Sequence, residues 1–132
     1  MEKIRQCLQN DRFAAGAGIE LVDVSPGCAK ARMTLGPQHH NGLGSVQGGA
    51  IFTLADFAFA AAANSHGTVA VAIDVYITFI KAAQAGVLLA EAKEVSKGFK
   101  LGTYSVEVKN EQGEMIALFQ GTAYRKADKL PV

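Results

Sequence analysis

This sequence has almost no net charge and no long hydrophobic segment. Its 13 lysines and arginines nearly balance its 12 aspartates and glutamates, so no overall field favours nucleic acid or an anionic membrane as a partner. The longest apolar stretch, residues 50–63, is too short to span a bilayer and contains Asp56. The charged residues 1–6 lack the apolar core of a signal peptide. We therefore expect a cytoplasmic protein that binds neither nucleic acid nor membrane.

Cysteine and metal-ligand motifs are equally scarce. Cys7 and Cys28 are the only cysteines and do not form a close-spaced pair, so we expect reduced thiols that pack as small buried hydrophobic side chains. The three histidines, His39, His40 and His66, have no cysteine or carboxylate around them at metal-ligand spacing. We expect no metal site.

The chain has enough hydrophobic residues for one core. At 132 residues and 49% hydrophobic content, with no linker or repeat, residues 1–132 are expected to form a single domain. Apolar side chains three to four positions apart predict a short amphipathic helix over residues 3–13. Alternating apolar residues around a Ser-Pro-Gly turn predict a hairpin over residues 19–35.

Residues 48–64 are apolar nearly all round and predict a helix that must be buried. After this helix the periodicity changes to that of strands separated by glycine-containing turns. The predicted strands are 68–80, 87–96, 101–110 and 115–125. One buried helix between an early hairpin and a later run of strands predicts an α+β fold, in which an antiparallel sheet wraps around a long central helix.

Two features of this helix point to chemistry. Gly48 and Gly49 open it, where backbone N–H groups have no intrahelical acceptor and no Cβ blocks the approach of a carbonyl oxygen. Asp56 lies among apolar residues, where an ionised carboxylate is costly to bury without a partner or a task. The alternatives are that the glycines only allow close backbone packing, and that Asp56 is a buried structural partner of a backbone or hydroxyl group.

The spacing of these groups has a consequence for assembly. Gly48 and Asp56 are eight residues apart, so about 12 Å separates them along one helix. A single carbonyl group cannot contact both. Two antiparallel copies of the helix across a two-fold axis would bring Gly48 of one chain to Asp56 of the other. We therefore expect an active site shared between two chains.

The order of residues over 41–56, Asn-x5-Gln-Gly-Gly-x2-Phe-x-Leu-Ala-Asp, resembles the PaaI-like thioesterases of phenylacetate degradation. The resemblance continues through residues 69–74 and 117–125 and covers nearly all of the chain after Ile19. It implies a hotdog fold and the hydrolysis of acyl-CoA without metal, with coenzyme A present only as part of the substrate. It also implies a homodimer that is usually paired into a homotetramer.

By this resemblance Asp56 would act as general base or nucleophile, the Gly48 N–H would polarise the thioester, and Asn41 would orient substrate or water. Two positions depart from the family pattern. Gln47 stands where the family usually has His before Gly-Gly, and an amide cannot exchange protons. Ala72 stands where some relatives have a Ser or Thr that holds the attacking water.

The resemblance also places coenzyme A along the connection 97–100, where Lys97 and Lys100 would meet its phosphates; otherwise this segment is a solvated turn. Most aromatic side chains are expected in the core, with one or two lining the acyl chamber. The predicted substrate-binding residues are Gly49, Ala72, Phe79, Lys97, Gly98, Phe99 and Lys100. Phenylacetyl, hydroxybenzoyl and medium-chain acyl groups all remain candidates, and Asn41-Gly42 is also a favourable turn dipeptide.

Two other functions compete with hydrolysis. A non-catalytic hotdog domain that binds acyl-CoA is favoured by Gln47 and Ala72, whereas Asp56 counts against it. A dehydratase or hydratase needs an acid and base pair that usually includes a histidine, and only His39 and His40 lie near the start of the predicted helix.

Overall fold

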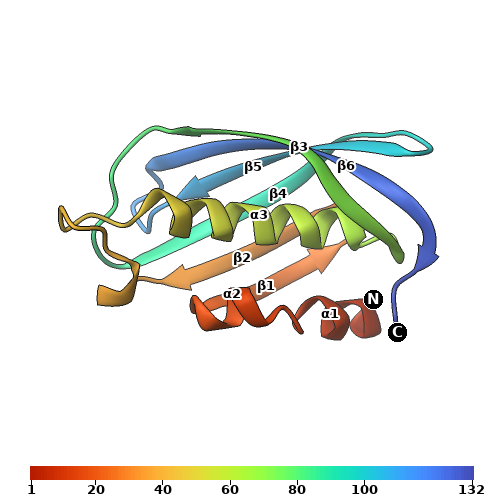
Figure 1. Cartoon of the computed structure of the whole chain (residues 1–132), viewed down its shortest axis with the longest axis horizontal. Coiled ribbons are helices and arrows are strands. Elements are labelled where there is room, and N and C mark those ends of the chain that lie inside the picture. Colours follow the sequence, from red (N-terminus) through yellow and green to blue (C-terminus); the bar gives the residue numbers. More distant parts are fainter.

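The computed structural model describes all 132 residues and contains one antiparallel sheet of six strands. The elements are α1 (Glu2–Leu8), α2 (Arg12–Gly16), β1 (Ile19–Ser25), β2 (Cys28–Thr34), a 3-10 turn (Pro37–His39), α3 (Gly48–Asn64), β3 (Thr68–Phe79), β4 (Val87–Lys97), β5 (Leu101–Lys109) and β6 (Met115–Lys129). The sheet wraps around α3, which packs against all six strands (Figure 1). The predicted α+β hotdog architecture is confirmed.

Two predicted elements differ from the structure. The single helix expected over residues 3–13 is divided into α1 and α2, because Asp11 caps a new helix by accepting a hydrogen bond from the Ala14 N–H at 2.9 Å. The last strand also differs, because β6 continues beyond its predicted end at Arg125 to Lys129. The order of strands in the sheet is β1-β2-β4-β5-β6-β3. β3 therefore lies at one edge of the sheet and pairs only with β6.

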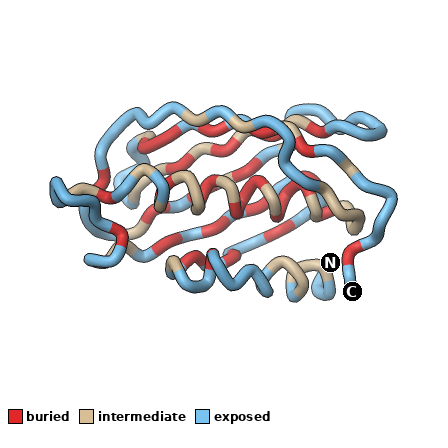
Figure 2. The backbone as a smooth tube through the Cα atoms, in the orientation of Figure 1, coloured by how far each residue is buried: buried red, intermediate tan, exposed pale blue.

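The core is formed where α3 meets the inner face of the sheet. Nine of the 17 residues of α3 are buried, and Figure 2 shows buried residues recurring along this helix and along the strands it packs against. Phe59 is 1% exposed, and its ring packs between the rings of Tyr104 and Phe119, at centroid distances of 5.7 and 5.6 Å. Opposite it, Gly121 leaves the space that this ring occupies. No helix has the length and hydrophobicity that a membrane-spanning segment needs.

The C-terminal end of α3 is fixed by the turn between β1 and β2. The Ser65 hydroxyl, buried, accepts a hydrogen bond from the Gly27 N–H at 2.7 Å. Glu94 receives a hydrogen bond from the Tyr104 hydroxyl at 2.6 Å, and His66 Nε2 lies 2.8 Å from the same carboxylate oxygen. Polar side chains therefore hold this end of the helix at several points.

The edge strand β3 carries exposed hydrophobic side chains. Ile73 is 58% exposed and Tyr76 is 71% exposed, although both lie in a strand with high hydrophobic content. The outer edge of β3 pairs with no other strand of this chain. An edge of this kind is a ready template for a further strand.

Candidate active site

The N-terminal end of α3 is held in place by backbone hydrogen bonds. The Gln47 N–H donates to the His39 carbonyl at 2.8 Å, and the Val46 N–H donates to the Ala83 carbonyl at 2.8 Å. Gly48 follows as the first residue of the helix, so its N–H has no intrahelical acceptor. The fold thus positions a free donor at the positive end of the helix dipole.

Phe79 lies directly against Gly48. A Cβ at Gly48 would stand 3.2 Å from Cζ of the Phe79 ring, so only glycine lets the ring approach this closely. Phe79 is 51% exposed, and it lines a cavity of about 310 Å³ with Asn41, Gly48 and Lys81. The Phe79 ring and the Gly48 backbone therefore form two walls of the same cavity.

Asn41 has a structural role in the loop before α3. Its Oδ1 accepts hydrogen bonds from the N–H groups of Leu43 at 2.8 Å and Ser45 at 3.2 Å. This is the turn role that the Asn-Gly dipeptide predicts. Because the side chain also lines the cavity beside Gly48, its amide N–H groups are available to a ligand there.

Gln47 precedes the helix but does not cap it with its side chain. The side chain is exposed, and its Oε1 lies 2.8 Å from the position that a Cβ of Gly49 would take. Gly49 is itself exposed, and its carbonyl accepts a hydrogen bond from the Thr53 hydroxyl at 2.7 Å. Gln47 thus lies over the first turn of α3.

Asp56 is half-buried in the middle of α3, on a partly exposed stripe that includes Thr53, Ala60 and Asn64. Its carboxylate makes no hydrogen bond or ion pair within the chain, so it has no structural partner there. Burial raises the pKa of Asp56 above its ordinary value of 3.8, and the negative charge of Asp11 raises it further. Both influences make the charged form of Asp56 costly, and no group of the same chain offsets that cost.

The predicted coenzyme A segment lies at the other end of the molecule from Gly48. Figure 1 shows the β4–β5 turn, residues 97–100, beyond the C-terminal end of α3. Arg125 Nη1 donates to the Gly98 carbonyl at 2.8 Å, and β6 continues beyond its predicted end at Arg125. Phe99 is 89% exposed, and Lys100 Nζ lies over its ring at 5.7 Å from the centroid. Lys97 is also exposed.

The predicted residues thus fall into separate groups. Asn41, Gln47, Gly48, Gly49 and Phe79 gather at the start of α3. Asp56 is two helical turns away, at about 12 Å along the axis. Ala72 is exposed on the edge strand β3, opposite Ala123 of β6. Within one chain the structure does not bring these groups to one point.

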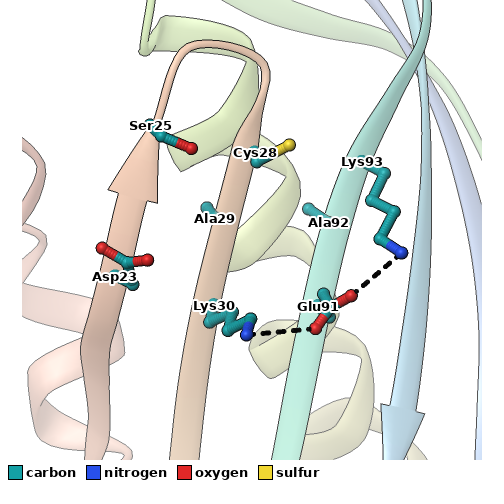
Figure 3. A pocket seen from close by; sticks show the side chains of 8 residues that line it. All are labelled: Asp23, Ser25, Cys28, Ala29, Lys30, Glu91, Ala92 and Lys93. Carbon is teal, nitrogen blue, oxygen red and sulfur yellow. Dashed lines mark ion pairs between the residues drawn. The ribbon is translucent and has the colours of Figure 1, made fainter.

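Cys28 is not buried, which corrects the prediction for this residue. Ala29, Ala31 and Met33 of β2 face the core, so the alternation of the strand turns Cys28 outward. Figure 3 shows it in a small pocket on the outer face of the sheet, where Glu91 forms ion pairs with Lys30 at 3.6 Å and Lys93 at 3.2 Å. The pocket contains none of the predicted site residues. Cys7 is half-buried.

Two charged residues near the site were not predicted from the sequence. Asp11 acts on the pKa of Asp56 from the N-cap of α2. Lys81 lines the cavity beside Gly48 and is ion-paired with Glu114. The capping role of Asp11 could have been predicted, because aspartate is a preferred residue at a helix start. Nothing in the local sequence indicates that Asp11 lies close to α3. Both residues reach the site from distant segments.

Comparison with known proteins defines the class. The profile of the thioesterase superfamily matches residues 43–117, which include Gly48 and Asp56. A protein from Archaeoglobus fulgidus is 43% identical over 99% of this chain and 86% of its own length. The acyl-coenzyme A thioesterase PaaI of Escherichia coli is 40% identical over 89% of this chain and 84% of its own length.

Comparison with solved structures points to the same family. The structure of the Escherichia coli PaaI protein has a TM-score of 0.89 and covers 96% of this chain and 98% of its own, at 35% identity. A variant of PaaI from Thermus thermophilus has a TM-score of 0.84 at 35% identity and covers 88% of this chain and 100% of its own. The chain therefore belongs to the thioesterase superfamily. Within it, the predicted class of acyl-CoA thioesterase similar to PaaI is confirmed.

Proposed function

We propose that two copies of this chain form a shared site that hydrolyses an aryl- or medium-chain acyl-CoA to the free acid and coenzyme A. The observation that carries the proposal is Asp56, a half-buried carboxylate on the thioesterase segment that has no partner within the chain. A buried acid without a structural partner fits a catalytic role. Burial and the charge of Asp11 raise the pKa of Asp56, which makes its carboxylate a stronger base than an exposed aspartate.

The chemistry needs one base or nucleophile and one donor to the carbonyl oxygen. Asp56 either takes a proton from a water that attacks the carbonyl carbon, or attacks that carbon itself and forms an anhydride that water then hydrolyses. In both cases the C–S bond breaks and coenzyme A leaves as a thiolate. The thiolate takes up the proton that Asp56 removed from the attacking water or, in the anhydride route, a proton from the water that hydrolyses the anhydride and restores the Asp56 carboxylate. The Gly48 N–H donates to the developing oxyanion.

Neighbouring side chains adjust this chemistry. Gln47 supplies an amide and no proton, so the carboxylate has to carry the acid–base work. Ala72 has no hydroxyl to hold the attacking water, and the free amide N–H groups of Asn41 take that orienting role or contact the substrate. Coenzyme A enters only as part of the substrate.

The free edge of β3 supports the assembly of two chains into a dimer. Pairing of two β3 strands across a two-fold axis would cover Ile73 and Tyr76 and continue the sheet into a second chain. The two α3 helices would then lie antiparallel, with Gly48 of one chain near Asp56 of the other. The same arrangement brings the β4–β5 turn of one chain, with Lys97 and Lys100, to the end where its partner's Gly48 lies. A pair of such dimers gives the homotetramer.

A mixed-dimer experiment tests the shared site. Asp56→Ala and Gly48→Pro chains are each inactive in the proposal, because one lacks the carboxylate and the other lacks the N–H donor. Proline is accommodated in the first helical turn, and the half-exposed Phe79 ring has room to move away from it. A mixed dimer has one site with both intact groups, so it regains about half of the wild-type turnover.

Differential tags isolate the mixed dimers, and release of free thiol from acyl-CoA measures turnover. The matched control is a mixture of differently tagged Asp56→Ala chains, which stays inactive. If isolated mixed dimers of two folded parent variants stay inactive, the shared-site proposal is wrong and the catalytic groups must be sought within one chain.

A further inference from the structure

A second cavity lies along the half of α3 that follows Asp56. It is a groove of about 340 Å³ between α3 and the α1–α2 segment, which runs alongside α3 (Figure 1). The apolar part of its lining consists of Cys7, Leu8, Phe57, Ala60, Ala61 and Leu130. Asn10, Asp11 and Asn64 complete it. This volume lies at the lower end of the range for small-molecule sites, which suits one part of a larger ligand.

The lining of the groove on α3 starts at Phe57, the residue after Asp56. Ala60 lies one turn after Asp56 on the same partly exposed stripe of α3. The α3 residues in the lining run from Phe57 to Asn64, so the groove follows the helix for about 10 Å towards its C-terminal end. Asp11, whose charge reaches the Asp56 carboxylate, also lines it.

The two cavities can be compared with the two arms of a thioester substrate. The carbonyl carbon carries a pantetheine thiol on one side, with its polar amides, and an acyl chain on the other. The cavity beside Gly48 combines five hydrophobic residues with Asn41, Ser45 and the cationic Lys81, whereas no cationic side chain lines the groove. The groove beside Asp56 has apolar side chains along most of its length and small alanines on its α3 side.

We propose that the groove between α3 and the α1–α2 segment binds the acyl chain of a medium-chain acyl-CoA. The proposal rests on the proposed function, since it takes Asp56 as the group beside the carbonyl carbon. An extended chain follows the groove from Asp56 towards Asn64, and its methylenes lie against Leu8, Phe57 and Ala60. Ala60 sets how far the chain enters, because it is the half-exposed small residue in the first turn of the groove.

The test changes the size of two lining residues and measures kcat/KM for acetyl-, hexanoyl-, octanoyl- and phenylacetyl-CoA. Ala60→Phe fills the groove and is expected to lower kcat/KM for octanoyl-CoA by about 10- to 100-fold relative to acetyl-CoA. Leu8→Ala enlarges the groove from the opposite side and is expected to raise the ratio of octanoyl- to acetyl-CoA turnover. Ala127→Phe, at an exposed position of β6 outside any cavity described above, is the size-matched control.

Retained acetyl-CoA turnover shows that each variant is folded and assembled. If Ala60→Phe does not fold, Ala60→Val and Leu8→Ala carry the test. Equal effects on all four substrates, or none, would overturn the groove proposal, as would a loss confined to phenylacetyl-CoA. These outcomes leave the role of Asp56 untouched, because Asp56→Asn tests that role separately with acetyl-CoA.

Discussion

The two ends of α3 are built differently. At the C-terminal end Ala61, Ala62 and Ala63 are at most 1% exposed, and the Ser65 hydroxyl and the His66 ring hold the helix to the neighbouring strands. At the N-terminal end the first residues are exposed or half-exposed, and the Gly48 N–H has no acceptor. One end satisfies its polar groups and packs densely, whereas the other leaves a donor free for a ligand.

This division shows how one helix provides both stability and chemistry. Burial of the second half contributes to the free energy of unfolding, and it fixes the axis along which the first half projects. The open end then costs little, because its unpaired groups are solvated until a ligand arrives. Variants at the two ends are therefore expected to have opposite consequences for stability and activity.

The largest expected effect concerns Asp56. Asp56→Asn removes the base or nucleophile but keeps the shape of the side chain, so turnover of acyl-CoA is expected to fall by about 100-fold or more. Thiol release measures turnover, and circular dichroism checks the fold. Asp23→Asn, an exposed acid on β1, is the control and keeps wild-type turnover. Wild-type activity in the Asp56 variant would remove Asp56 from the mechanism.

A pair of glycine substitutions compares the two halves of α3 directly. A Cβ at Gly121 would lie 2.8 Å from the buried Phe59 ring, whereas a Cβ at Gly48 would lie 3.2 Å from the half-exposed Phe79 ring. Gly121→Ala is expected to lower the free energy of unfolding by about 1–3 kcal/mol, because the buried Phe59 ring cannot move away from the added Cβ. Gly48→Ala is expected to change it by less than about 0.5 kcal/mol.

Urea unfolding measures both free energies, and thiol release measures turnover. Gly48→Ala is expected to lower turnover despite its small effect on stability, since the added Cβ enters the cavity beside the N–H donor. Equal losses of stability in the two variants would mean that the open end is packed as tightly as the closed one.

The pH dependence of activity and stability gives a smaller effect. Burial and then Asp11 raise the pKa of Asp56 above 3.8, and the ionised form is the reactive one. The acid limb of kcat/KM is therefore expected above that value, and Asp11→Asn, which retains a helix-capping oxygen, is expected to move it to lower pH. A pH profile of both proteins measures the shift; identical profiles would contradict the coupling.

The same raised pKa has a defined sign for stability. The folded state holds the Asp56 proton more tightly than the unfolded state, so this stabilisation is complete below the unfolded pKa and is lost as pH rises through the folded pKa. Asp56→Asn is therefore expected to be more stable than wild type at pH values above the folded pKa, with the advantage shrinking in acid. Urea unfolding at several pH values measures it.

The smallest expected effect is at Gln47. Its side chain is exposed and does not cap α3, so Gln47→His is expected to leave the melting temperature nearly unchanged. Turnover is expected to be retained or raised, because histidine adds a proton-exchanging group at this position. Thermal unfolding and thiol release test this. Complete loss of folding or activity would show a specific role for the amide.

Local patterns predict some of these features and not others. The bounds of α3 and of the β1–β2 hairpin can be predicted from hydrophobic periodicity and turn residues, because these signals lie close together in the sequence. The structure contains both elements. The edge position of β3 does not follow from its own residues, because strand pairing depends on the whole sheet. Cys28 was misplaced for a related reason, since one step along a strand reverses its face.

The candidate site divides in the same way. Asn41, Gln47 and Gly48 belong to one continuous motif, so the sequence alone places them together. Asp11 and Lys81 come from segments on either side of α3 in the sequence, and only the folded chain brings them to Asp56 and Gly48.

The pairing of β3 with β6 has a consequence for how the protein reaches its native state. β4, β5 and β6 follow one another as hairpins, whereas β3 must find a strand beyond that whole meander, with Thr68 opposite Lys129. Contacts between distant segments form slowly because a long loop must close first. We therefore expect the strand with the free edge to dock late, and the final refolding phase to accelerate with protein concentration as a second chain captures it. A final phase with the same rate at all concentrations would show that β3 is in place before the chains meet.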